Sequence, residues 1–138
     1  MWLLFHLYGI LFPNLHKAQL VGCHFSETTN KKNNDKNMVT CYLKYVIDPF
    51  QLDVFEQYGK KWIELVNRFG GQHHGYFMPS EGANNIAYAL FSFNSLAEYE
   101  NYRTLILTDK ECQEMFKLAN DTKCILSYER TFLRPVFD

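Results

Sequence analysis

The stretch GGQHHGYFMPSEGANNIAYALFSFNSLAEY, residues 70–99, contains two strand patterns in succession and then the start of a helix. Gln72 to Met78 is typical of a short strand, and the turn residues at 79–82 separate it from a second strand at 85–93. The second strand is almost wholly apolar, which indicates a central position with both faces buried. The middle of the fold is therefore a pair of strands with no helix between them.

Upstream of this stretch, the chain has the pattern of a strand followed by a helix. Residues 39–47 (VTCYLKYVI) are rich in β-branched and aromatic side chains, and their even-numbered positions form the more polar face. Apolar side chains then recur at helical spacing from Phe55 to Phe69, where a pair of glycines ends the helix. We expect Asp48 to be the N-cap of this helix and Pro49 to occupy its first position.

Downstream, two capping boxes predict a helix that is broken in two. Ser95 with Glu98 starts the first half, and Thr108 with Glu111 starts the second. Residues 124–132 have the pattern of a fourth strand. The order β-α-β-β-α-β predicts an α+β fold, a ferredoxin-like sandwich of helices on an antiparallel sheet.

Helices can cover only one face of such a sheet, and the other face still carries tyrosine and phenylalanine. A second copy of the chain is the economical cover, so we expect a homodimer in the form of a dimeric α/β barrel. A closed barrel of this kind encloses a cavity that can bind a small organic molecule.

The first 37 residues differ from the domain at 38–138. The apolar run at 2–12 is shorter than the roughly 20 residues that span a bilayer, so we expect no stable membrane span. An Asn- and Lys-rich stretch follows, with the composition of a disordered linker. We interpret 1–37 as an N-terminal extension, and Met38 is a candidate for the true start. A lipoprotein anchored at Cys23 is the less favoured alternative.

Composition excludes several classes of function. The net charge is −1, so the chain lacks the basic excess that neutralises nucleic-acid phosphates. The four cysteines form no C-x-x-C pair and have no zinc spacing, although a Cys112–Cys124 disulfide is conceivable. We therefore expect free thiols, a cytoplasmic location, no metal and no cofactor.

Four residues are candidates for lining the cavity: Tyr42, His74, Tyr76 and Arg130. Strand alternation places His74 on the same face as Tyr76, where it could act as an acid or base. Arg130 is expected beside Leu126, Tyr128 and Phe132, with Tyr42 and Lys44 as neighbours. An arginine there is either paired with an acid or available to an anionic ligand. If the four converge, with Ala87 and Ala89 leaving room, they form a site for a small carboxylate or phenolic compound.

The simpler interpretations of these residues are structural. His74 is then a hydrogen-bonded histidine, Arg130 is an ion-paired arginine, and Trp62 with the Phe91 and Phe93 pair is core.

The ordered motifs of the domain resemble those of the NIPSNAP family, within the wider group of dimeric α/β-barrel proteins. The resembling residues over 38–137 are Ile47-Asp48-Pro49, Gly70-Gly71, His73 to Phe77, Glu81 to Asn85, Leu90 to Phe93 and Ser95 to Tyr99. The resemblance implies a ferredoxin-like fold and dimerisation, and it implies little about activity. The chain departs from the family pattern where histidine, tryptophan and tyrosine are common, at Ala89, Phe91 and Phe93, and where an early helical arginine is replaced by Tyr99.

Three functions follow from this resemblance and from the candidate residues. The first is a small-molecule binding or interaction module without catalysis. The second is a cofactor-independent enzyme that resembles the monooxygenases or isomerases of the wider group. The third and weakest is haem binding through a histidine of the cavity.

Overall fold

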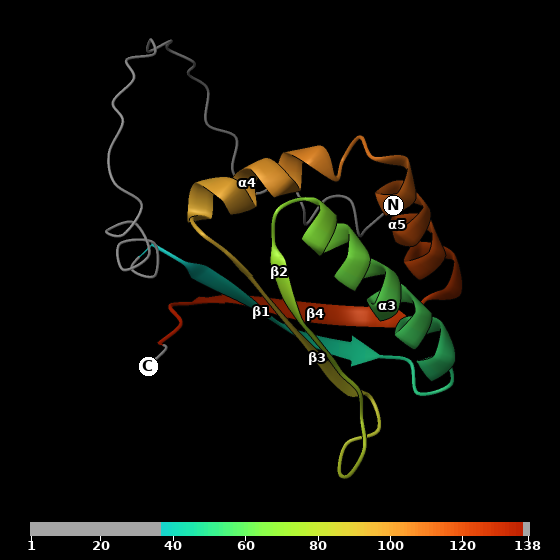
Figure 1. Cartoon of the computed structure of the whole chain (residues 1–138). Coiled ribbons are helices and arrows are strands. Elements are labelled where there is room, and N and C mark those ends of the chain that lie inside the picture. Colours follow the sequence, from blue (N-terminus) through green and yellow to red (C-terminus); the bar gives the residue numbers. More distant parts are fainter. Residues whose placement is uncertain (1–36, 137–138) are drawn as a thin grey trace, which may run out of the picture.

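The computed structural model describes residues 37–136, which form one sheet and three helices (Figure 1). The elements in chain order are β1 (Val39–Ile47), α3 (Leu52–Arg68), β2 (Gln72–Phe77), β3 (Ile86–Phe93), α4 (Leu96–Leu105), α5 (Lys110–Thr122) and β4 (Ile125–Leu133). The four strands lie in the order β2-β3-β1-β4, and each pair of neighbours is antiparallel. The predicted α+β, ferredoxin-like fold is confirmed, and β3 holds a central place in the sheet.

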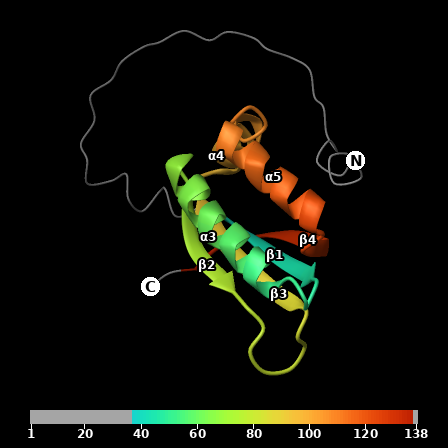
Figure 2. The same cartoon turned by 90° about the vertical axis from the view of Figure 1, so that its right-hand side faces the viewer.

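All three helices lie on one face of the sheet, as the two views together show (Figures 1 and 2). The buried stripe of α3 includes Phe55, Trp62 and Leu65, none of which is more than 5% exposed. It packs on the odd-numbered residues of β1 and β3, where Ala87 and Ala89 are fully buried. Small side chains at these two positions leave room for the rings of their strand neighbours, Tyr45 and Tyr76.

A glycine in the middle of α3 sets how closely this helix approaches β2. A Cβ atom at Gly59 would lie 2.9 Å from the ring of Tyr76, so no larger side chain fits without movement. Glycine weakens a helix by roughly 1 kcal/mol relative to alanine. At this cost, the absence of a side chain at Gly59 gives Tyr76 its place beneath the helix.

Two predicted helix starts are wrong by a few residues. Asp48 does not cap α3: its carboxylate accepts the amide of Phe50 in a turn, and the helix begins after Gln51. The second half of the broken helix begins after Asp109, whose side chain accepts the amide of Cys112. Asp is as good an N-cap as the predicted Thr108, and it lies one residue closer to the helix.

The predicted break between α4 and α5 is confirmed. Ser95 caps α4 by accepting the amide of Glu98. The carboxylate of Glu98 accepts from the side chain of Asn94, so only the serine half of the predicted capping box is formed.

Two β-bulges change the face on which some side chains lie. In β2, pairing with β3 shifts between His73 and Gly75, so His74 is an extra residue. Gly75 has φ +119, a conformation that favours glycine, and its amide donates to His73 Nδ1. In β4, a second shift between Val46 and Ile47 of β1 leaves Leu126 as the extra residue.

These bulges correct two predictions about faces. Tyr76 pairs with Ala89 on the helix-covered face, whereas His74 contacts Ser92 on the opposite face. Leu126 is 60% exposed and does not share the face of Arg130. Alternation with a period of two fails wherever one extra residue interrupts the ladder.

The sheet face opposite the helices, which we call the open face, is covered by no element of residues 37–136. It carries Tyr42 and Tyr88, whose rings stack with centroids 5.6 Å apart. Phe77 at 52% exposure and Leu133 at 44% belong to the same face. The inward side of β3 is fully buried, whereas on its other side Ser92 is buried but Ile86, Tyr88 and Leu90 are only half-buried, so the prediction of burial on both faces holds only in part within residues 37–136.

Our predictions for the N-terminal extension include the Cys23 anchor and the start at Met38. Residues 1–36 lie outside the described part of the chain, so these stay predictions. Within the domain, Cys41, Cys112 and Cys124 are buried free thiols, so the conceivable Cys112–Cys124 disulfide is not formed. No helix between residues 37 and 136 is both long and apolar enough to cross a membrane.

Candidate functional site

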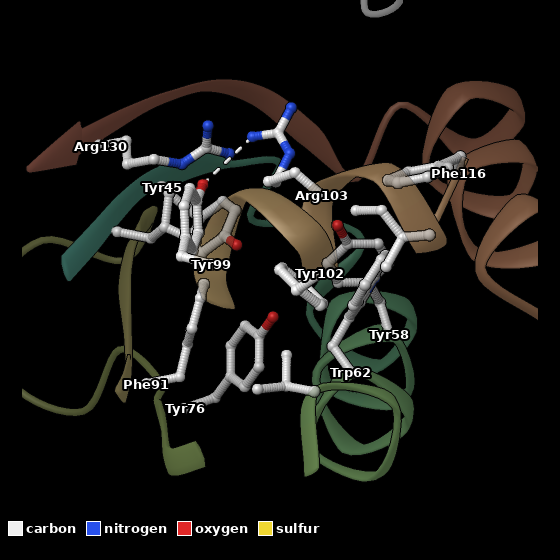
Figure 3. Close-up of a pocket in the computed structure, with 13 residues that line it drawn as sticks. Tyr45, Tyr58, Trp62, Tyr76, Phe91, Tyr99, Tyr102, Arg103, Phe116 and Arg130 are labelled. Carbon is white, nitrogen blue, oxygen red and sulfur yellow. Dashed lines mark hydrogen bonds between the residues drawn. The ribbon is translucent and has the colours of Figure 1, made fainter. Parts of the chain in front are cut away.

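A pocket of about 60 Å³ lies between the helix-covered face of the sheet and the helices (Figure 3). We expected a cavity between the sheets of two subunits, whereas this pocket lies on the other side of the sheet, within one chain. Its lining consists of Leu43, Tyr45, Tyr58, Trp62, Val66, Tyr76, Phe91, Tyr99, Tyr102, Arg103, Ile106, Phe116 and Arg130.

Most of the pocket wall is aromatic. Tyr45 stacks on Tyr76 with ring centroids 6.1 Å apart, and both rings contact Phe55 beneath them. On the helix side, Trp62 packs against Phe116 at 5.3 Å. Rings held edge to face and offset in this way move little, so the wall is preorganised before any ligand enters.

The polar part of the pocket comes from two arginines on different elements. Arg103 reaches in from α4 and Arg130 from β4, and their guanidinium groups lie near one another (Figure 3). Arg103 Nη1 donates to the hydroxyl of Tyr99 at 3.2 Å. The Nε groups of both arginines, and Nε1 of Trp62, are buried without a hydrogen-bond partner in the described part of the chain.

Neither arginine forms an ion pair with a carboxylate of residues 37–136. The ion pairs of the domain lie on the helix surfaces, as in the network that joins Arg68 to Asp109 and Glu111. The guanidinium of Arg130 lies over the ring of Tyr128, 5.5 Å from its centroid, which offsets part of the cost of burying the charge. The structural interpretation of Arg130 as an ion-paired residue is therefore wrong within this part of the chain.

The tyrosines of the pocket are neutral and Arg130 is charged at neutral pH. Burial raises the pKa of every tyrosine in the lining, although for Tyr99 the two guanidinium groups act in the opposite direction. Burial acts to lower the pKa of Arg130, but the neighbouring Tyr99 and Cys41 raise it above its usual range. The pocket thus presents neutral hydroxyls and two cations, and none of its lining residues is a histidine or a carboxylate.

His73 lies beside the pocket lining, behind two of its rings. Its imidazole stacks on Tyr76 at 5.0 Å and lies 5.5 Å from Phe91. Burial, assisted by the nearby His74, lowers the pKa of His73 to about 4. This histidine is therefore neutral at physiological pH, and its Nδ1 is already occupied by the amide of Gly75.

The lowered pKa of His73 predicts a loss of stability in mild acid. The unfolded chain binds a proton near pH 6.5 and the folded domain only near pH 4, so stability falls as the pH falls through that window. We expect a loss of about 1–2 kcal/mol between pH 7 and pH 5, measured by urea unfolding. His73→Phe should flatten this dependence, whereas His74→Gln should keep it. An unchanged pH profile in His73→Phe would contradict the assignment.

The four predicted site residues divide between the two faces of the sheet. Tyr76 and Arg130 line the pocket. Tyr42 lies on the open face against Tyr88, and His74 Nε2 lies 2.7 Å from Ser92 Oγ on that same face. The expected convergence of all four does not occur within one chain, because Arg130 faces Tyr45 and Tyr99 rather than Tyr42 and Lys44.

Sequence reasoning missed several residues that contribute polar groups to the pocket, among them Arg103, Tyr99 and Trp62. A signal for Arg103 was available, since it falls on the inner stripe of α4 between Tyr99 and Ile106, where an arginine is unusual. Trp62 was interpreted as core, and at 5% exposure it is core, but it also borders the pocket.

Across residues 37–136, no cluster of three or more His, Cys, Asp or Glu side chains is placed to hold a metal ion.

Comparisons with known proteins agree on the family and the fold. Residues 42–137 match the family model described as NIPSNAP. An uncharacterised NIPSNAP-like domain protein from Burkholderia xenovorans is 22% identical, with a TM-score of 0.63 over 73% of this chain and 87% of that one. A NIPSNAP family protein of unknown function from Agrobacterium tumefaciens is 19% identical, with a TM-score of 0.63 over 72% of this chain and 89% of that one.

A more distant solved structure shares the fold but is described as a different kind of protein. A candidate antibiotic biosynthesis monooxygenase from Bacteroides thetaiotaomicron is 17% identical, with a TM-score of 0.54 over 75% of this chain and 93% of that one. A search of curated protein sequences found no match. At these identities the solved structures establish the fold and leave the activity open.

Proposed function

This chain belongs to the NIPSNAP family, and the NIPSNAP structures to which it is similar have no assigned reaction. We propose that it is a homodimeric module that binds a small organic molecule. The supporting observation is the pocket beneath the helices, where three buried N–H groups lack a partner among residues 37–136. An unsatisfied buried donor costs roughly 1–3 kcal/mol, and a ligand that accepts from these groups would recover that free energy.

Binding within the pocket is testable without knowing the natural ligand. A panel of small fragments, added to the full chain labelled with nitrogen-15, should shift the indole resonance of Trp62 and the amides of α4 and β4. Fragments with a hydrogen-bond acceptor should act more strongly than hydrocarbons of the same size. A panel that shifts none of these resonances at millimolar concentrations would contradict the proposal.

We propose that the homodimer forms through the open face. That face carries stacked tyrosines and a half-buried Leu90, and exposed apolar side chains lie along its edges. An apolar sheet surface of this kind is the usual mark of an interface. A second copy packed against it would bury Tyr42 and would place His74 at the interface rather than in the pocket.

Leu90→Arg is expected to convert the dimer to a monomer. Leu90 lies in the middle of the open face on β3, where a new charge would be buried without a partner on both subunits. Analytical ultracentrifugation at micromolar concentration measures the change. Leu96→Arg is the matched control, because Leu96 is 52% exposed on α4, away from the open face. A monomeric wild-type chain, or a dimeric Leu90→Arg variant, would contradict this interface.

An enzyme that resembles cofactor-independent monooxygenases is the alternative function. The shared fold of the candidate monooxygenase supports it, but the pocket offers no group that exchanges a proton near pH 7. A binding role needs no such group and is therefore preferred. Oxygen consumption in the presence of electron-rich phenols would favour the enzyme. For location, the three buried free thiols support the cytoplasm.

A further inference from the structure

The strongest unexplained feature of the molecule is a pair of adjacent arginines without an anion. Arg103 and Arg130 come from different elements and meet at one edge of the pocket (Figure 3). Like charges repel, and the repulsion is stronger in a partly dehydrated site than in water. Among the described residues, no carboxylate forms an ion pair with either of them. An anion placed between the two guanidinium groups would remove this unfavourable arrangement.

The free edge of Arg103 fits a carboxylate. Its Nη1 is occupied by the hydroxyl of Tyr99, and its buried Nε has no partner. The Nε edge of a guanidinium presents two parallel N–H groups, which match the two oxygens of a carboxylate. The Nε of Arg130 is buried and free in the same way.

Tyr99 adds a third donor beside Arg103 Nη1, at the same side of the pocket. Its hydroxyl accepts a hydrogen bond from Arg103, so its own proton remains available to an acceptor. The ring is held in place by Phe132, with centroids 4.9 Å apart, and by Phe93 at 5.8 Å. This hydroxyl is therefore positioned before a ligand arrives.

The size and the walls of the pocket limit what can carry the anion. A volume of about 60 Å³ is well below the roughly 150 Å³ that admits a benzene ring. It is enough for a carboxylate and a short carbon chain. The aromatic walls formed by rings such as Tyr45, Tyr76 and Phe91 offer contacts to such a chain. Apart from the indole N–H of Trp62, they add no N–H donors of the kind that would surround a phosphate on several sides.

We propose that the pocket binds the carboxylate group of a small aliphatic acid, held between Arg103 and Arg130 with Tyr99 as a further donor. This inference rests on the proposed binding function and names the chemical class of its ligand.

The test measures the fluorescence of Trp62 in the full chain. Trp2→Phe leaves Trp62 as the single tryptophan, and Trp62 borders the pocket. This protein is titrated with acetate and propionate, with the neutral isosteres acetamide and propionamide, and with inorganic phosphate. Ionic strength is held constant with sodium chloride, which also tests for non-specific effects of anions.

We expect a saturable change with the carboxylates and none with the amides. Arg103→Met and Arg130→Met should each weaken carboxylate binding at least tenfold, since each removes a charged donor. Arg134→Met is the matched control, because it removes the same charge from an exposed position outside the pocket, and it should bind like the parent protein. Circular dichroism of each variant confirms that it is folded.

The remaining outcomes overturn the inference in distinguishable ways. Equal binding of acetate and acetamide, or tighter binding of phosphate, would reject the carboxylate but keep a binding module. Unchanged affinity in both arginine variants would reject the assigned residues. No saturable change with any compound would count against both the carboxylate and the proposed function.

Discussion

Phe55→Ala is expected to destabilise the domain by about 3–5 kcal/mol, the range for removing a fully buried phenylalanine ring. Phe55 has no exposed surface and lies beneath two pocket rings, with centroids 5.2 Å from Tyr45 and 5.8 Å from Tyr76. Its loss leaves a void under α3 and removes the support of both tyrosines. Urea unfolding at one fixed protein concentration measures the effect, since dimerisation contributes to apparent stability.

Phe50→Ala is the matched control for this effect. Phe50 precedes the same helix but is 94% exposed, so the same substitution should change stability by no more than about 0.5 kcal/mol. Similar losses in the two variants would show that the core is not organised around α3 in the way described. Phe55→Ala should also weaken ligand binding, because the pocket wall rests on that ring.

Arg130→Met is expected to change stability in the opposite direction. Without a ligand, Arg130 has a buried Nε that lacks a partner and a neighbouring cation in Arg103. An apolar side chain of similar length removes both costs and forfeits the contact with the ring of Tyr128 and the interaction with the neighbouring Cys41. Replacing buried charged groups by apolar ones is often stabilising by about 1–4 kcal/mol, and we expect a gain within this range.

Thermal and urea unfolding of the ligand-free protein measure this gain, and Arg130→Lys is its informative companion. Lysine keeps the charge but loses the planar fork, so this variant should gain little stability and should bind a carboxylate poorly. A loss of stability in Arg130→Met would mean that Arg130 is a structural residue. A gain together with weaker binding is the behaviour of a residue retained for its ligand at the expense of stability.

The sequence was sufficient to predict the order of elements, because each element has a strong local pattern. The apolar run of β3, the helical spacing from Phe55 to Phe69 and the Ser95 cap were each recognisable within a short window. The start of α3 was harder to recognise, because the Asp48-Pro49 pair fits either a helix start or a turn. The structure has the turn.

The site was only partly predictable, since it depends on contacts between distant segments. Tyr76 and Arg130 were identified by residue type, and both line the pocket. His74 was assigned to the face of Tyr76 because alternation alone cannot reveal an extra residue in a strand. The meeting of Arg103 with Arg130 was not predicted, because it depends on where α4 crosses the end of β4.

The bulge at His74 makes strand length, rather than residue type, the determinant of which side of the sheet receives Tyr76. Deletion of His74 would remove the bulge and leave Gly75 opposite Leu90 and Tyr76 opposite Ala89, so Tyr76 would stay on the helix-covered face. A strand of the present length without the bulge would instead place Gly75 under α3 and Tyr76 on the open face, so the pocket would lose one of its rings. In such a strand, one unpaired residue, rather than any property of its side chain, keeps a phenol in the pocket and off the open face.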